Sequence, residues 1–265
     1  MFISKKNYKM FVFISILCSL FSAAALFYSK TVSAQSINDI RFMTENYPPF
    51  NFEQNGTLQG ISVDLMEEML KKTGSNKTRK DIQLLPWARG YHYIQNEKNT
   101  SLFAMTRTEE REKLFKWVGP IAEATIVLTA SKERKLSITS PEDMKKYKIG
   151  AVIQDVGEQL LIEAGVPAKG IDSTGGTNAI SKSIKKMNLG RLDAFAYDQN
   201  VFKWELKKQG FDVNLYETVY VLKSGELYYA FHKDTPDDII QKMQASLDAL
   251  KSEGVYQKIR DTYLK

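Results

Sequence analysis

Apolar runs alternate with amphipathic segments along most of this chain, and the alternation restricts the fold more than any other feature. The extended runs Ile40 to Thr44, Ile82 to Leu85 and Leu102 to Met105 each precede a segment with a helix start or helical periodicity. Such an order is typical of an α/β unit with a mainly parallel sheet, in which ligands bind beyond the carboxyl ends of the strands.

A second alternation follows, with strands predicted at 148–153 and 192–197 and helices between and after them. Residues 117–120, Trp-Val-Gly-Pro, are expected to break the pattern before it. Extended runs at 124–130 and at 219–231, the latter split at 223–225, are expected to cross between two lobes as a two-segment hinge. The predicted organisation is 35–124 for the first segment of lobe 1, 125–223 for lobe 2 and 224–265 for the return to lobe 1.

The N-terminus is typical of a secretory signal. Three lysines at positions 5, 6 and 9 precede an uncharged, mostly apolar run at 10–28, and the small residues at 32–34 favour cleavage before Gln35. We expect residues 1–34 to be removed, with an uncleaved membrane anchor as the alternative. The single cysteine, Cys18, follows leucine rather than a small residue, so we expect no lipid anchor and a periplasmic protein.

The charge of the remaining chain is close to neutral. Removing residues 1–34 takes away four lysines and no acidic residue, which lowers the formal charge from +6 to +2. Nucleic-acid binding therefore loses its main support. No cysteine remains either, so in an oxidising compartment the chain must be held together by its core alone.

The stretch from Ala104 to Arg111 is the densest in candidate binding groups. A short buried strand is followed by Thr108 as a predicted N-cap and by acidic residues in the first helical turn. Arg111 falls at the third helical position, where a cation opposes the helix dipole. Either its guanidinium and the helix amides form a site for a carboxylate or phosphate, or it pairs with Glu109 or Glu110 on a solvated face. Both hypotheses stay open at this point.

Other candidate side chains also follow predicted strand ends. Tyr47, ahead of two prolines that stiffen its loop, and Trp87 are well placed to cover a ligand, although aromatic residues more commonly fill the edge of a core. Asp198 ends one strand and precedes the next helix, where it either binds a ligand or caps the helix. Together with Thr106 and Arg111, they suggest a binding site at the sheet edge.

Five segments resemble the extracellular solute-binding proteins of family 3, the polar amino-acid type with a two-lobed Venus-flytrap fold. They are Tyr47 to Phe50, Gly60 to Leu65, Met105 to Arg111, Gly190 to Asp198 and Gly254 to Ile259. Each is a weak signal alone, but their order matches the family, and the resemblance covers essentially all of the chain after residue 34. It implies an α/β, type II periplasmic-binding-protein fold without a cofactor.

The resemblance also implies roles for individual residues. Arg111 would bind the α-carboxylate of an amino-acid-like ligand, with help from Thr106. Tyr47 and Trp87 would hold the side chain of the ligand between them, and Asp198 would bind its α-ammonium group from the other lobe. An anion site and a cation site on different lobes would make lobe closure depend on the ligand.

The sequence departs from the family pattern at positions 155–156. The second lobe usually offers Gly-Thr there, whereas this chain has Asp-Val, so a donor hydroxyl is missing and a negative charge is added. The change favours a cationic, larger or modified ligand and makes Asp155 a candidate contact. Four further residues lie near the expected cleft in sequence, and for each we expect a solvated surface position rather than ligand contact. These are Glu45, Arg89, Arg107 and Tyr197.

The predicted function is capture of an amino-acid-like solute by a monomer, for delivery to the permease of an ABC-type transporter. A sensory module that reports to a membrane receptor is one alternative. A periplasmic dehydratase-like enzyme with Glu45 or Asp155 as general acid is another. Catalysis is not expected, because His92 and His232 are predicted on ordinary surfaces and the sequence shows neither a metal-spaced cluster nor a nucleophile with a base at motif spacing.

Overall fold

One eight-stranded sheet runs through residues 36–265, which form one compact unit of this computed structural model. The structure describes residues 35–264, so the predicted signal segment 1–34 lies outside the described residues. No helix within the described range has both the length and the apolar character needed to cross a membrane. The strand order is β4 (Gln83–Leu84), β1 (Arg41–Thr44), β5 (Thr100–Thr106), β10 (Tyr216–His232), β6 (Phe115–Ser131), β9 (Ala194–Asp198), β7 (Ile149–Val152) and β8 (Ile171–Thr174).

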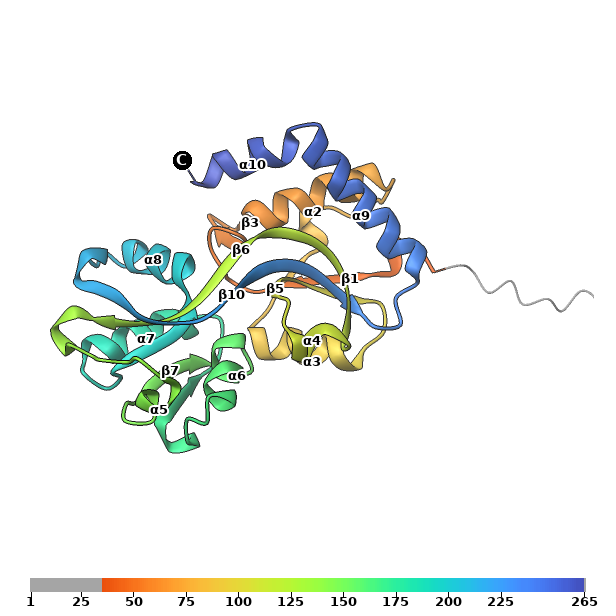
Figure 1. Ribbon diagram of the computed structural model, residues 1–265. Helices are drawn as coiled ribbons and strands as arrows, with labels where there is room; N and C mark the ends of the chain where they lie inside the picture. The colour runs from red at the N-terminus through yellow and green to blue at the C-terminus, as the bar shows by residue number, and fades with distance from the viewer. Residues whose placement is uncertain (1–34, 265) are drawn as a thin grey trace, which may run out of the picture. The chain divides into compact units, whose positions relative to one another are not determined.

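The pairing pattern divides this sheet into two lobes. In the first lobe β1 pairs in parallel with β4 and β5, and in the second β7 pairs in parallel with β8 and β9. The antiparallel strands β6 and β10, each of 17 residues, pass from one lobe to the other side by side (Figure 1). The predicted two-lobed α/β fold is therefore confirmed.

Helices cover both lobes. Those of the first lobe are α2 (Ile61–Lys72), α3 (Trp87–Asn96), α4 (Glu109–Glu112), α9 (Asp237–Ser252) and α10 (Val255–Leu264). Those of the second are α5 (Pro141–Met144), α6 (Val156–Glu163), α7 (Ala179–Asn188) and α8 (Gln199–Lys208). Each of the short 3-10 turns lies next to a strand in the chain, and they are η1 (Ile37–Asp39), η2 (Arg79–Asp81), η3 (Lys132–Arg134), η4 (Ala168–Gly170) and η5 (Val213–Leu215).

The two crossing strands are longer than the sequence suggested. Residues 117–120 and 223–225, which were expected to interrupt extended structure, lie inside β6 and β10. The ladder shifts register between Leu227 and Tyr229, opposite Pro120, so the proline lies at an irregularity where no ladder N–H is required. The ladder also pairs Thr125 with Ser224, although the boundaries 124/125 and 223/224 themselves stay a prediction.

Helix α2 starts ahead of Ser62, a residue whose side chain has the chemistry of an N-cap. The N-cap is Gly60, with φ of 121°, and a Cβ there would overlap the carbonyl oxygen of Phe50. Glycine therefore allows the helix to begin directly against the loop of residues 47–50. The strands β2 (Phe52–Gln54) and β3 (Thr57–Gln59) form a hairpin with a tight two-residue turn, in which Asn55 and Gly56 both have positive φ.

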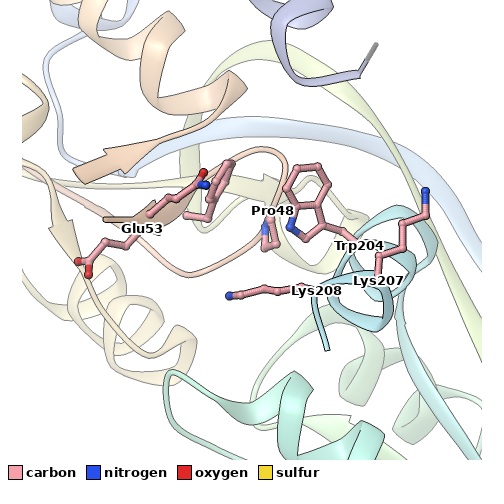
Figure 2. Close-up of a pocket in the computed structure, with 7 residues that line it drawn as sticks. Pro48, Glu53, Trp204, Lys207 and Lys208 are labelled. Atoms are coloured by element: carbon pink, nitrogen blue, oxygen red, sulfur yellow. The ribbon is translucent and has the colours of Figure 1, made fainter. Parts of the chain in front are cut away.

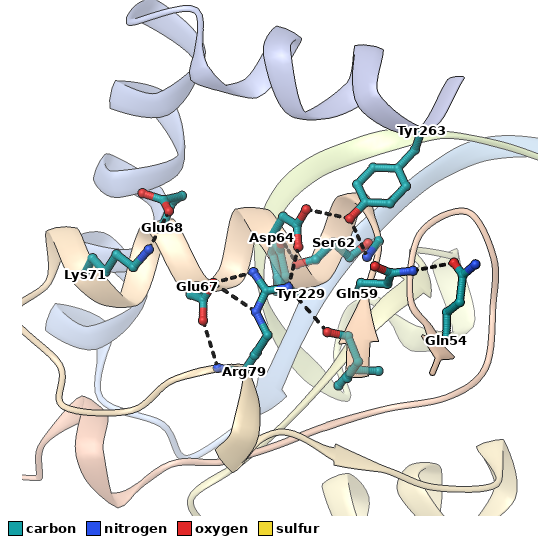
Figure 3. Close-up of polar contacts among 12 residues, drawn as sticks. Gln54, Gln59, Ser62, Asp64, Glu67, Glu68, Lys71, Arg79, Tyr229 and Tyr263 are labelled. Atoms are coloured by element: carbon teal, nitrogen blue, oxygen red, sulfur yellow. Dashed lines mark hydrogen bonds and ion pairs between the residues drawn. The ribbon is translucent and has the colours of Figure 1, made fainter. Parts of the chain in front are cut away.

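Polar contacts tie the C-terminal helix to this same region (Figure 3). The hydroxyl of Tyr263 donates a hydrogen bond of 2.6 Å to Asp64 and accepts one of 3.2 Å from the amide of Gly60. Arg79 pairs with Asp64 and with Glu67 (Figure 3). Helix α10 is thus hydrogen-bonded to the start of α2, which packs directly against the loop of residues 47–50.

Candidate functional site

Arg111 is completely buried at the start of α4. Thr108 is the N-cap, as predicted, and its side chain accepts from the amide of Arg111. The guanidinium donates one hydrogen bond of 3.2 Å, from Nη1 to the carbonyl of Thr106. Its Nε and Nη2 atoms are buried without a hydrogen-bond partner among the described residues. The alternative in which Arg111 pairs on a solvated face is therefore wrong.

Two aromatic rings hold this guanidinium in place. Its central carbon lies 5.3 Å from the ring centre of Trp87 and 5.1 Å from that of Tyr91. The two rings are stacked, with centroids 5.5 Å apart and planes at 22°. Tyr91 was missed in the sequence, although it lies one helical turn after Trp87 and so had to share its face. Stacking leaves the in-plane N–H groups of Arg111 free to bind a carboxylate.

Asp198 is fully buried at the end of β9. Its Oδ1 accepts from the amides of Asn200 and Val201, at 2.9 and 3.0 Å, and its Oδ2 accepts from the amide of Thr125 at 3.2 Å. The interpretation of Asp198 as a helix cap is confirmed. A carboxylate has about four acceptor positions, so capping leaves room for a further donor.

Glu45 and Asp155 are also buried, which contradicts the surface position expected for Glu45. Burial raises the pKa of Glu45 well above its usual range, the charge of Asp155 adds to this, and Arg111 opposes it. Burial likewise raises the pKa of Asp155, against the charge of Arg111 and the amides at the start of α6. Burial raises the pKa of Asp198 to about 6, although the amides that it binds favour its charged form.

The hydroxyl of Tyr47 lies within electrostatic range of all these groups. Burial raises its pKa well above the ordinary value, the carboxylates Asp198, Asp155 and Glu45 raise it further, and Arg111 lowers it. Arg111 and Asp198 are thus both buried and both act on the pKa of the same buried hydroxyl. We call these buried side chains the buried cluster, and its members are Glu45, Tyr47, Arg111, Asp155, Tyr197 and Asp198.

Direct contacts close the two lobes over the buried cluster. The rings of Tyr47 and Tyr197 lie 5.5 Å apart, and the indole Nε1 of Trp87 donates to the carbonyl of Gln154 at 2.8 Å. Tyr197 was expected at the surface, but it is buried, and its hydroxyl has no hydrogen-bond partner among the described residues.

A small cavity adjoins the cluster, with Glu45, Trp87 and Tyr197 among its lining residues but neither Arg111 nor Asp198. Its volume is about 10 Å³, which is the space of a single water. An amino acid is much larger than this, so the lobes have to separate before such a molecule enters.

The remaining candidates lie away from the buried cluster. Arg107 pairs with Glu112, and Arg89 is exposed on α3, so the surface position expected for these two is confirmed. His92 is exposed as predicted. His232 is only 5% exposed, against expectation, and its Nδ1 accepts from a neighbouring backbone amide at the end of β10.

Two lobes joined by paired crossing strands, with a charged cluster buried between them, define a two-lobed solute-binding protein fold. The family described as bacterial extracellular solute-binding proteins, family 3, matches residues 40–265. The chain therefore belongs to this family.

Similar proteins bear names that refer to amino acids. A protein of Bacillus subtilis named "Probable amino-acid-binding protein YxeM" is 27% identical over 218 residues, covering 81% of this chain and 79% of its own. The "Probable histidine-binding protein" of Campylobacter jejuni is also 27% identical, covering 82% and 81%. Among solved structures, an ancestral arginine-binding protein bound to glutamine is 26% identical with a TM-score of 0.70, covering 85% of this chain and 97% of its own.

Proposed function

We propose that this protein captures an amino-acid-like solute between its lobes. The observation that carries the proposal is the buried guanidinium of Arg111, whose Nε and Nη2 have no partner among the described residues. Buried donors without acceptors are costly, and a hydrogen bond to a charged group contributes about 1.5–3 kcal/mol. A ligand carboxylate at Arg111, assisted by Thr106, and a ligand ammonium group at Asp198 complete both ends of the buried cluster.

The charges of the buried cluster favour a ligand with an additional positive charge. Glu45, Asp155 and Asp198 are three buried carboxylates, and Arg111 is the one cation buried with them in the described cluster. The α-carboxylate and α-ammonium groups of a ligand cancel each other, so a neutral amino acid leaves this imbalance unchanged. A cationic side chain directed at Glu45 and Asp155, between Tyr47 and Trp87, reduces it.

Transport is the wider role that we propose. The exported chain, after removal of residues 1–34, acts as a periplasmic monomer without a cofactor and delivers its ligand to an ABC-type transporter. Opening and closing take place about the boundaries 124/125 and 223/224. The names of the two relatives support ligand binding rather than catalysis.

Calorimetry with a small panel of amino acids tests the ligand class. Arginine, lysine and histidine are expected to bind, glutamine to bind more weakly and glutamate not to bind. Arg111→Ala is expected to abolish binding, and Arg111→Lys to restore little of it, because a point charge replaces a bidentate fork. Normal affinity in both variants would exclude Arg111 as the carboxylate site.

Glu45→Gln distinguishes contacts with the side chain of the ligand from contacts with its α-carboxylate and α-ammonium groups. It preserves size and removes a charge, so it is expected to weaken arginine or lysine at least tenfold and glutamine only slightly. Equal losses for all ligands would contradict a role for Glu45 in side-chain selection. Uptake of radiolabelled ligand by cells lacking the gene, complemented with wild type or with Arg111→Ala, then tests transport.

A further inference from the structure

A second aromatic contact joins the lobes outside the buried cluster. The ring of Phe52, in β2 of the first lobe, lies 5.6 Å from that of Trp204, in α8 of the second, with planes at 49°. Phe52 also contacts Tyr263 of α10, at 6.1 Å and 87°. The indole of the second lobe therefore rests on a first-lobe ring that is itself supported by the C-terminal helix.

Open space surrounds this contact. A groove of about 410 Å³ lies between Phe52, Trp204 and Lys208, and a second of about 360 Å³ lies between Trp204 and Tyr263. In Figure 2 the indole of Trp204 lies beside Pro48, and the side chain of Lys208 extends below it into the groove. The indole is thus bounded by solvent-accessible space rather than by a packed core, so its removal leaves the interior of each lobe intact.

The contact lies on the two segments that also carry ligand-site residues. Helix α8 is capped by Asp198 at its start and presents Trp204 in its second turn. The loop that begins at Tyr47 continues directly into Phe52. No residue lining either groove belongs to the buried cluster. A change at Trp204 can therefore alter how these segments meet without touching the ligand.

We propose that Phe52 and Trp204 are positioning residues that set ligand affinity by holding the closed lobes together. This inference rests on the proposed function, because it assumes that the ligand binds the closed form. Apparent affinity is reduced in proportion to the fraction of protein in the competent state. Aromatic pairs contribute about 0.5–1.5 kcal/mol beyond their buried area, so loss of the contact corresponds to a two- to tenfold change in that fraction.

Three tryptophan variants test the proposal with the ligand from the calorimetric panel. Trp204→Leu is expected to raise Kd two- to tenfold, mainly through a faster koff in stopped flow, whereas Trp204→Phe retains the ring contact and most of the affinity. Trp117→Leu is the matched control, because Trp117 is also half-buried and its ring contacts Phe115, Tyr228 and the guanidinium of Arg107, all in the first lobe. Unchanged Kd in Trp204→Leu, or equal losses in Trp204→Leu and Trp117→Leu, would overturn the proposal.

A distance measurement without ligand separates this inference from the proposed function. Spin labels at Lys113→Cys and Glu163→Cys, both exposed positions on opposite lobes, report the separation of the lobes in the chain of residues 35–265, which contains no other cysteine. Trp204→Leu is expected to decrease the short-distance population relative to Trp204→Phe and Trp117→Leu. If the three variants show the same distances, Trp204 does not hold the closed lobes together, even if ligand binding is normal. A clear difference supports this role of Trp204 even if no amino acid of the panel binds.

Discussion

The indole Nε1 of Trp87 donates a hydrogen bond of 2.8 Å to the backbone carbonyl of Gln154, joining α3 of the first lobe to the turn before α6 of the second. Gln154 has φ of 60°, a left-handed conformation that is uncommon for a residue other than glycine. Closure over the buried cluster is thus secured partly by protein atoms. The ligand does not have to supply all of the free energy that holds the lobes together.

Trp87→Phe is expected to weaken ligand binding while leaving the fold intact. The ring can still stack on Tyr91, but the donor to Gln154 is lost, and a hydrogen bond of this kind contributes about 0.5–1.5 kcal/mol. Calorimetry should show a two- to tenfold rise in Kd. Trp117→Phe is the control, because the Nε1 of Trp117 donates to Glu112 within one lobe. A comparable loss of affinity in that control would show that interlobe bonding is not the cause.

Asp198→Asn and Asp198→Ala are expected to differ in stability but not in ligand binding. Asparagine can still cap the helix through Oδ1, but its Nδ2 cannot accept from the amide of Thr125, so the free energy of unfolding should fall less than in Asp198→Ala. Alanine loses the bonds to Asn200, Val201 and Thr125 and should cost at least 1–2 kcal/mol. Both remove the charge that we assign to the ligand ammonium group. Chemical denaturation and calorimetry measure the two effects, and full affinity in Asp198→Asn would rule out the assignment.

Ligand affinity and stability are expected to depend on pH in opposite directions at Asp198. Its pKa is raised from 3.8 to about 6 by burial, so ionisation in the folded protein costs stability as pH rises through this window. The unfolding free energy of wild type minus that of Asp198→Asn should therefore increase as pH falls from 7 to 4. Cationic ligands need the ionised form, so their affinity should fall below pH 6, by up to about tenfold per pH unit for one proton. A flat affinity profile would contradict this.

Gly60→Ala is expected to destabilise the protein by about 1–3 kcal/mol and to weaken ligand binding as well. A methyl group there would overlap the carbonyl of Phe50, and φ of 121° is strained for alanine. Relief of this overlap has to displace the loop that positions Tyr47. Gly56→Ala serves as the control, since its Cβ meets no atom within 4 Å, although its positive φ still adds some strain. The prediction is refuted if Gly60→Ala unfolds no more easily than Gly56→Ala.

Periodicity predicted the lobes and most helices, but it did not predict the continuity of the crossing strands. Gly119 and Pro120 indicate a break by local rules, yet they lie within β6 because the opposite strand shifts register there. That compensation depends on the pairing of β6 with β10, about 100 residues away along the chain. Similarly, Ser62 has good capping chemistry, and only the contact of Gly60 with Phe50 explains why the helix starts earlier.

The candidates that the structure finds buried include charged residues that follow a strand end. Arg111 and Asp198 were singled out for that position, and both are buried, as is Asp155, while their roles in binding stay predictions. Glu45 and Tyr197 were expected at the surface, because nothing adjacent in the sequence shows that the opposite lobe covers them. Burial of such groups is a property of closure and is visible only when both lobes are in place.

The pairing of Thr125 with Ser224 has a mechanical consequence. The two crossings form one antiparallel ladder, so sliding of one strand along the other would break backbone hydrogen bonds. We therefore expect both strands to bend together when the lobes separate, and the same side chains to meet again when the lobes close.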